Sequence, residues 1–210
     1  MIVNINNSKF LDIPVDSLMK EFKKLLGQPY VYGGIGTSKK CTSTKCTVHD
    51  KDKKYKGFDC SGYVYHVLSK WDYNKFGRST SQMQSSSGYG QWILNKQDLK
   101  VGDLIFYNGH CGVISKISNK TIYMYHATKC GDTIKEAKID YRKDFTKGLR
   151  ILKCNLDNKT NTNNDTNNKN QDTYWRVCVT SCKDINEARK ILEQVKNKGF
   201  KDAFIVEYKK

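Results

Sequence analysis

The chain has 210 residues, only two of them proline, and a formal net charge of +16. It contains no run of 18 apolar residues, which excludes a membrane-spanning helix, and its first residues lack the basic and apolar regions of a secretory signal. We therefore expect a globular protein without a membrane partner, made and kept in the cytoplasm. Its length suffices for one domain of ordinary size and a small second module.

Most of the positive charge lies ahead of Asn155. Residues 1–154 hold 26 Lys and Arg against 13 Asp and Glu, a difference of +13, and the remaining residues contribute +3. Such a surface attracts polyanions, which include nucleic acid, anionic lipid and the anionic polymers of a bacterial wall. The sequence shows no helix-turn-helix and no paired CxxC fingers, so we expect no nucleic-acid partner.

The first elements are a helix, an extended segment and a loop. Residues 13–27 predict an amphipathic helix, with Pro14 tolerated in its first turn and Gly27 just past its end. Residues 28–34 alternate aromatic side chains and end in a glycine pair, which is typical of an extended segment closing on a turn. Residues 35–57 carry seven Lys and two Asp with almost no apolar content, which predicts a long exposed loop.

Cys60 stands at the first turn of a second predicted helix, which ends near residue 71. Its apolar residues recur at helical spacing: Tyr63, Val64, Val67, Leu68 and Trp71. Asp59 or Ser61 provides the polar start. A thiol there faces unpaired backbone N–H groups and the positive end of the helix dipole, which both favour the thiolate. From this segment alone, an inert buried cysteine is an equally good interpretation.

A run of strands follows a polar loop at 77–90 and a short helical or extended piece around Trp92. The predicted strands cover residues 101–107, 112–117, 121–127 and 149–152. Asn108-Gly109 is a strong hairpin-turn signal between the first two. A helical layer followed by strands predicts an α+β fold, with the helix packed on an antiparallel sheet.

Two histidines complete a candidate catalytic set with Cys60. His110 lies at the mouth of the second strand and His126 on the third, so antiparallel pairing of 112–117 with 121–126 brings the two side chains close together. Hydrolysis of an amide by a thiol requires a thiolate, an imidazole that activates it, a group that orients the imidazole and an oxyanion donor. Taken alone, either histidine is more often a core or surface residue.

Cys41-x4-Cys46-x2-His49 offers three metal ligands at irregular spacing. A basic surface loop with incidental thiols is the better interpretation. The eight cysteines form no secreted-type disulfide framework, and we interpret them as mainly free thiols. We predict no metal site and no cofactor.

The C-terminal quarter divides into two parts. Residues 155–172 are too polar to bury anything and predict a disordered, Asn-rich linker. Residues 173–210 predict a βαβ module with strands at 174–180 and 203–208 around a helix at 185–198. Because fewer than 40 residues leave a bare two-stranded edge, we predict a homodimer through 173–210. We expect residues 1–154 to form a separate domain that carries the candidate catalytic residues.

Six blocks in order resemble the NlpC/P60 family of papain-like bacterial cell-wall peptidases. They are residues 29–34, 58–64, 78–82, 101–106, 109–113 and 125–127, and the resemblance covers about residues 14–153. It implies cleavage of peptidoglycan stem peptides, characteristically between D-γ-glutamate and the diamino acid. Peptidoglycan is therefore the expected partner.

The resemblance also implies the roles of individual residues. Cys60, His110 and His126 correspond to the catalytic triad, with the backbone N–H of Cys60 as an oxyanion donor. Tyr30 is implied to lie beside the thiol and to position substrate or oxyanion. Asp59 and Ser61 are implied to contact the amino end of the substrate.

Three features depart from the family pattern. Tyr32 stands where Trp is common, and Cys111 follows the catalytic histidine where Val is usual. The basic insertion at 35–57 borders the nucleophile, where it can narrow or redirect the substrate groove.

Residues 174–181 and 198–206 resemble half of a SPOR-like module, a type that binds bacterial glycan strands. Catalytic domain, linker and wall-binding tail together are similar to an endolysin of a phage or prophage, which is cytoplasmic until it is released to the wall. Two alternatives stay open. The first is an N-acetylmuramoyl-L-alanine amidase, which can use the same thiol and imidazole to hydrolyse a different amide. The second is a wall-binding protein whose papain-like domain is catalytically inactive.

Overall fold

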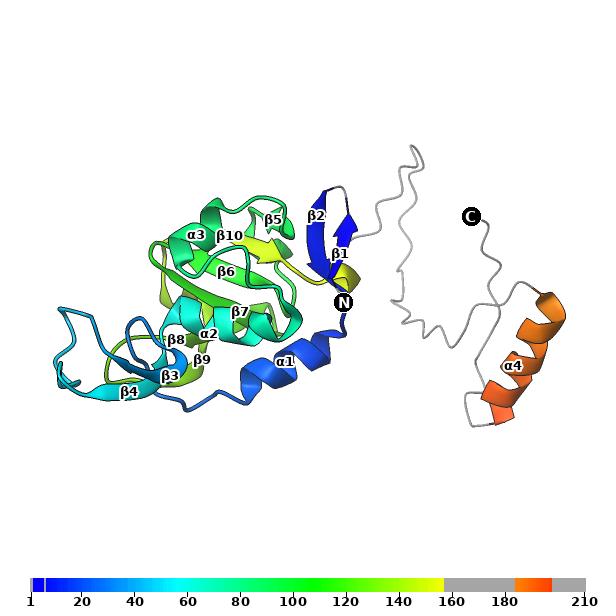
Figure 1. The fold of residues 1–210 in the computed structure, drawn as a ribbon. Helices are drawn as coiled ribbons and strands as arrows, with labels where there is room; N and C mark the ends of the chain where they lie inside the picture. The colour runs from blue at the N-terminus through cyan, green and yellow to red at the C-terminus, as the bar shows by residue number, and fades with distance from the viewer. Residues whose placement is uncertain (1, 6, 157–183, 198–210) are drawn as a thin grey trace. The chain divides into compact units, whose positions relative to one another are not determined.

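A computed structural model describes residues 2–5, 7–156 and 184–197 of the chain (Figure 1). The chain divides into two compact units, residues 1–159 and 160–210. In the second unit the structure describes α4 (Ile185–Asn197), which confirms the helix predicted there. Among the described residues, no helix has the length and apolar character needed to cross a membrane.

A six-stranded antiparallel sheet with the order β5-β10-β6-β7-β8-β9 is the centre of the first unit (Figure 1). Its strands are β5 (Gln91–Ile93), β6 (Leu104–Tyr107), β7 (His110–Ser118), β8 (Thr121–Ala127), β9 (Ile134–Lys138) and β10 (Phe145–Arg150). Two-residue turns join β6 to β7 and β7 to β8, since Tyr107 pairs with His110 and Ser118 with Thr121. The predicted Asn108-Gly109 hairpin turn is confirmed.

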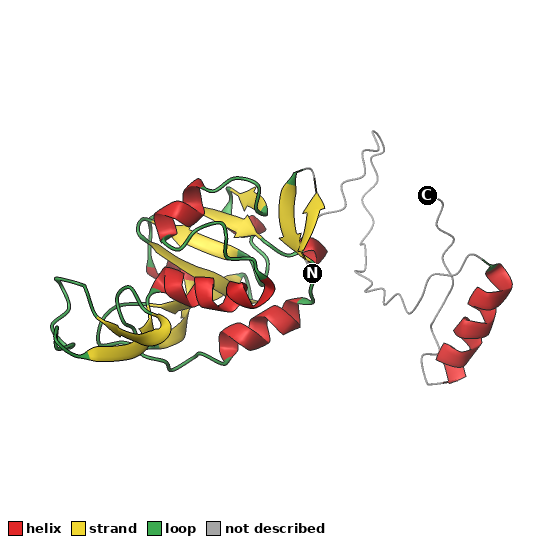
Figure 2. Ribbon diagram, viewed as in Figure 1, coloured by secondary structure: helices red, strands yellow, loops and turns green. Residues whose placement is uncertain are grey.

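Three helices accompany this sheet: α1 (Val15–Lys23), α2 (Cys60–Leu68) and α3 (Thr80–Ser85). Helix α2 packs on β7 and β8 and also contacts α1, as the ribbon view shows (Figure 2). Helices on an antiparallel sheet make the predicted α+β fold, which is confirmed.

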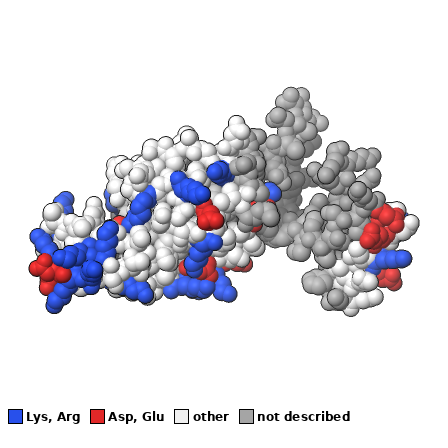
Figure 3. All heavy atoms as spheres, in the orientation of Figure 1, with Lys and Arg blue, Asp and Glu red and all other residues white. Residues whose placement is uncertain are grey.

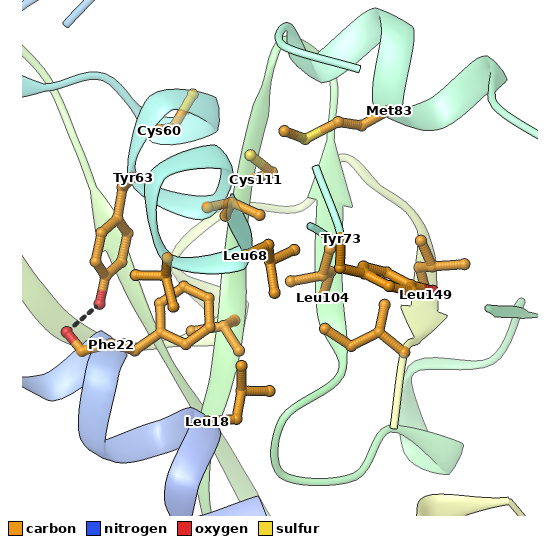
Figure 4. Close-up of a cluster of buried hydrophobic side chains, with 14 of the residues drawn as sticks. Leu18, Phe22, Cys60, Tyr63, Leu68, Tyr73, Met83, Leu104, Cys111 and Leu149 are labelled. Carbon is orange, nitrogen blue, oxygen red and sulfur yellow. Dashed lines mark hydrogen bonds between the residues drawn. The ribbon is translucent and has the colours of Figure 1, made fainter. Parts of the chain in front are cut away.

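The core lies between α1, α2 and the sheet, and Tyr63 joins the two helices. Its hydroxyl donates a hydrogen bond of 2.8 Å to the carbonyl oxygen of Phe22 (Figure 4). The two rings meet edge to face, with centroids 5.2 Å apart, a geometry that adds about 0.5–1.5 kcal/mol beyond the burial of the rings. Leu18 and Leu68 are fully buried in the same cluster. This packing fixes the direction of α2 and hence the position of its first residue.

The prediction of one long exposed loop over residues 35–57 is wrong at both of its ends, which are strands. The segment forms a hairpin of β3 (Ile35–Lys40) and β4 (Lys54–Phe58), paired from Lys40 opposite Lys54 to Ile35 opposite Phe58. Lysines gather over this hairpin, at the left of Figure 3. Because most of its side chains are exposed, the hairpin lacks the apolar alternation by which a strand is recognised.

Helix α3 lies in the segment predicted as a polar loop. Ser79 caps it, since its hydroxyl accepts a hydrogen bond from the Gln82 N–H at 3.2 Å, and the Gln82 side chain accepts one from the Ser79 N–H at 3.0 Å. This capping box is a sequence signature of a helix start. Only Thr80 and Met83 are buried in this helix. Two apolar-facing positions are too few for helical periodicity to be recognised in the sequence.

Three further strands were absent from the prediction: β9 and the N-terminal pair β1 (Ile2–Ile5) and β2 (Ser8–Leu11). The predicted strands at 174–180 and 203–208, and nearly all of the predicted linker at 155–172, lie outside the described residues.

Candidate active site

Cys60 is the first residue of α2, as predicted, and Asp59 is the residue that caps the helix. One oxygen of the Asp59 carboxylate accepts a hydrogen bond of 2.6 Å from the Gly62 N–H. A Cβ at Gly62 would overlap the carbonyl oxygen of Gly34, so only glycine permits this close approach. In Figure 4 the Cys60 side chain points away from the contact between Tyr63 and Phe22.

The antiparallel pairing of β7 and β8 brings His110 and His126 together. Nε2 of His110 lies 2.9 Å from Nδ1 of His126, and both residues are buried. The ring planes are nearly perpendicular, at 81°. Because Nε2 of His110 is engaged by His126, Nδ1 is the nitrogen that remains for a thiol.

Hydrogen bonding favours the thiolate of Cys60. The pKa of the Cys60 thiol is held well below its usual range, and the largest cause is a hydrogen bond from Cys111. Burial acts in the opposite direction, and His110 and Thr80 lower the pKa further. Thr80 Oγ1 lies 3.8 Å from the sulfur of Cys60 and 3.8 Å from that of Cys111. The pKa of Cys111 is raised well above its usual range by its contact with Cys60. Cys60 is therefore the thiol of the pair that ionises.

His126 stays neutral over the working pH range. Burial, followed by the nearby charge of His110, lowers the pKa of His126 to about 3. Its Nε2 is buried without a hydrogen-bond partner in the described part of the chain. When His110 is an imidazolium, Nδ1 of His126 must accept its proton, and the proton of His126 then resides on Nε2. An unsatisfied buried N–H of this kind costs about 1–3 kcal/mol.

Arg78 connects Asp59 and Ser61 to the turn before the hairpin. Its Nη1 donates to Ser61 Oγ at 3.0 Å, and its Nη2 donates to Asp59 Oδ2 at 3.2 Å and to the carbonyl oxygens of Gly33 and Gly34, each at 3.1 Å. Asp59 Oδ2 also accepts a hydrogen bond of 2.9 Å from the Gly33 N–H. The network fixes the glycine turn against the start of α2. The sequence pattern included Arg78 without assigning it a role.

Tyr30 approaches the same site from the segment before the glycine turn. Its backbone N–H donates to the carbonyl oxygen of Asp132 at 2.9 Å, and it forms a bridge with Phe58, two residues before Cys60. Burial, followed by the charges of Cys60 and Asp59, raises the pKa of the Tyr30 hydroxyl. The hydroxyl therefore stays protonated and can donate a hydrogen bond.

Tyr141 is a member of the site that the sequence prediction missed. Its ring centroid lies 4.8 Å from that of His126 and 6.2 Å from that of His110, and the residue is 48 % exposed. It ends a single turn of 3₁₀-helix between β9 and β10, where no periodic pattern marks an inward-facing position. Its ring covers the histidine pair from the solvent side.

The matches to protein families agree with this geometry. The model of the NlpC/P60 family matches residues 27–178, which is most of the chain. The chain belongs to the NlpC/P60 family. The model of the SPOR domain matches residues 155–207, which confirms the resemblance of the tail.

Two bacterial proteins are similar to the NlpC/P60 part. The chain is 28 % identical over 111 residues to the "Probable endopeptidase p60" of Listeria grayi, which covers 53 % of this chain and 17 % of that protein. It is 31 % identical over 93 residues to the "Probable peptidoglycan endopeptidase LytE" of Bacillus subtilis, which covers 44 % of this chain and 20 % of that one. The chain thus spans a fifth or less of the length of these two relatives.

A solved structure of a hypothetical invasion protein of Mycobacterium tuberculosis shares the fold. It superposes with a TM-score of 0.51 at 21 % sequence identity, covering 72 % of this chain and 70 % of that one. The two chains therefore share a fold at low sequence identity.

Proposed function

We propose that the protein is a cysteine peptidase that hydrolyses peptidoglycan stem peptides, with Cys60, His110 and His126 as its triad. The observation that carries the proposal is the pair of buried histidines 2.9 Å apart, in contact with a thiol of lowered pKa. A thiolate beside an imidazolium is the reactive form of a cysteine nucleophile.

Each member of the triad has one task. The sulfur of Cys60 attacks the carbonyl carbon of the scissile amide, and His110 gives its proton to the leaving nitrogen as the C–N bond breaks. The resulting thioester on Cys60 is hydrolysed by a water molecule that His110 deprotonates. His126 accepts the hydrogen bond from Nε2 of His110 and so keeps Nδ1 directed at the sulfur.

Two donors are available to the oxyanion. The backbone N–H of Cys60 lies in the first turn of α2, where N–H groups have no acceptor within the helix. The hydroxyl of Tyr30 stays protonated because its pKa is raised. Donors that are fixed before the reaction stabilise the tetrahedral intermediate without reorganisation.

Three observations support peptidoglycan as the substrate. The similar proteins carry the name endopeptidase, and one is named for peptidoglycan. The SPOR match gives the chain a second module, for which we propose binding to the wall. The net charge of +16 attracts anionic wall polymers. We propose the D-γ-glutamyl–diamino acid bond as the scissile amide, and an endolysin-like role in wall breakdown.

Product analysis on purified peptidoglycan tests this function. Digestion by the full chain is expected to expose a new amino terminus on the diamino acid, detected by mass spectrometry. Free lactoyl-linked muramic acid with a released L-Ala terminus would instead identify an amidase. Cys60→Ala is expected to abolish release, and Cys154→Ala, which removes an exposed thiol, is the matched control. Equal release by Cys60→Ala and the parent would refute cysteine catalysis, and no release by the parent would favour a wall-binding role.

Pairing of two chains through residues 173–210 stays a prediction. Sedimentation of the full chain at micromolar concentration, compared with a chain that ends at residue 156, tests it. A dimer that is lost on truncation is the expected result. A monomeric full chain would contradict it.

A further inference from the structure

Four metal-ligating side chains meet beside the β3–β4 hairpin. They are Cys41, Cys46, His49 and Cys130, and their ligand atoms all lie within 4.8 Å of one another. The first three come from the loop at residues 41–53, and the fourth comes from the loop between β8 and β9. The sequence showed only the first three, because the fourth lies more than 80 residues further along the chain.

The measured separations fit a tetrahedral zinc site. The sulfurs of Cys41 and Cys130 are 3.6 Å apart, and the sulfur of Cys46 lies 3.4 Å from Nδ1 of His49. Zinc bonds of about 2.3 Å to sulfur and 2.0–2.1 Å to nitrogen, at tetrahedral angles, place two sulfurs about 3.8 Å apart and a sulfur and a nitrogen about 3.5 Å apart. These two separations therefore match zinc-binding geometry, and the remaining ones are no longer than 4.8 Å.

Burial distinguishes these thiols from incidental surface cysteines. Cys41 is 5 % exposed and Cys46 is 7 % exposed, although the residues around them are mostly solvent-exposed. Both pack with Val31 in a small cluster of their own, which Cys130 also contacts. In the mostly exposed loop at residues 41–53, Cys41 and Cys46 are therefore buried at the same place.

The pairing of β3 with β4 also has features that a bound metal ion would offset. Lys40 lies directly opposite Lys54 in the pairing of β3 with β4, and like charges in that position are destabilising. The hairpin packs on α2, but a sheet of two strands contributes little stability of its own. A metal ion that ligates both the hairpin loop and the β8–β9 loop would close the open end of the hairpin onto the sheet.

The charge of the surroundings also fits. One Zn²⁺ with three thiolates and a neutral imidazole carries a net charge of −1, and the hairpin and its loop carry seven lysines against two aspartates. We propose that Cys41, Cys46, His49 and Cys130 bind one structural Zn²⁺ ion, which joins the β3–β4 hairpin to the β8–β9 loop. Four protein ligands are the mark of a structural rather than a catalytic zinc site.

The site is adjacent to the candidate active site but separate from its chemistry. The β8–β9 loop that carries Cys130 also accepts the backbone hydrogen bond of Tyr30, through Asp132. The β4 strand leads directly into Asp59 and Cys60. The zinc ion therefore stabilises the wall of the site on which Tyr30 lies, and takes no part in bond cleavage.

Metal analysis of the full chain, purified under reducing conditions, tests the proposal. We expect about one zinc ion per chain after gel filtration, falling to background in Cys46→Ser and Cys130→Ser. Cys154→Ser, which removes a thiol outside the cluster, and Cys60→Ala are expected to retain the zinc. Replacement of zinc by Co²⁺ in the parent chain should give the visible bands of tetrahedral cobalt with thiolate charge transfer. This spectrum is informative even where a ligand variant fails to fold.

Limited trypsin digestion gives a second readout that does not depend on activity. Lys45, Lys51 and Lys53 lie in the loop that the metal closes, so zinc is expected to protect these sites and a chelator to expose them. A parent chain that binds neither zinc nor cobalt would overturn the proposal. Retention of zinc by both ligand variants, or a Cys41–Cys130 disulfide in the chain purified without oxidant, would do the same.

Discussion

His126 holds His110 through a hydrogen bond of 2.9 Å, and its own far nitrogen is buried without a partner among the described residues. Burial keeps His126 uncharged. In this neutral form its Nδ1 accepts the hydrogen bond from His110. The proposed catalytic base is thus oriented by a second imidazole rather than by a carboxylate. The orienting residue itself therefore brings no negative charge to the site.

Removal of the His126 imidazole is expected to lower kcat on the order of 100-fold or more, because His110 loses the contact that orients it. His126→Asn places an amide oxygen near the same position and should retain more activity than His126→Ala. Kinetics on a soluble stem peptide check this, with kcat and KM determined separately. An equal loss in both variants, or a loss confined to KM, would contradict a positioning role for His126.

Cys111 is expected to set the acidic limb of the pH profile. The hydrogen bond from Cys111 is the largest cause of the lowered pKa of Cys60, so Cys111→Val should raise the pKa of the Cys60 thiol. The lower limb of the activity profile then moves to higher pH. Ultraviolet absorbance of the thiolate, titrated in the parent, in Cys111→Val and in the control Cys154→Ser, measures the shift directly. A lower limb that does not move would show that Cys111 does not lower this pKa and would leave His110 and Thr80 as its causes.

Acid should destabilise the fold through His126. Its folded pKa is lowered to about 3 and lies below the unfolded value of about 6.5, so the unfolded state binds the extra proton first as the pH falls. The contribution to stability is therefore complete above pH ~6.5 and is lost progressively on acidification, by roughly 3 kcal/mol near pH 4. Urea unfolding at several pH values checks this, and His126→Asn should show a smaller loss. Parallel curves for the two proteins would disprove the assignment.

Loss of Arg78 should destabilise the start of α2. The Arg78 side chain is 33 % exposed, so solvent screening reduces the value of its ion pair, and we expect Arg78→Ala to cost about 1–3 kcal/mol through its several charged hydrogen bonds. Lys153→Ala is the control, because its ion pair with Asp12 is exposed, with side chains 45 % and 42 % accessible, and it should cost less than about 1 kcal/mol. Urea unfolding of both variants measures the difference. A smaller loss at Arg78 than at Lys153 would show that the network around Asp59 contributes little to stability.

The parts of the site that the sequence predicted are those with local signals. Asn108-Gly109 has the composition of a two-residue hairpin turn and thereby fixed the start of β7, which positions His110. Cys60 was recognised because a polar cap and an apolar helical stripe surround it. The pairing of β7 with β8 then placed His126 beside His110.

The parts that were missed depend on contacts between distant residues. Cys130 lies far along the chain from Cys46, and nothing around it marks a ligand, so only the fold brings the two together. Arg78 joins Asp59 and Ser61 to the backbone carbonyls of Gly33 and Gly34, and contacts with backbone leave no pattern of side chains in the sequence. The β3–β4 hairpin was missed because exposed lysines occupy positions where strand prediction relies on apolar alternation.

The two ends of the β3–β4 hairpin lie side by side. Ile35 pairs with Phe58, and the Asp59 N–H donates to the carbonyl oxygen of Gly34 at 3.1 Å. A segment whose ends are already joined in this way can change length at a small entropic cost. The β3–β4 hairpin can therefore be replaced by a segment of another length without moving its two ends. Another loop grafted between these two anchor points would meet the substrate differently, while the nucleophile keeps its place.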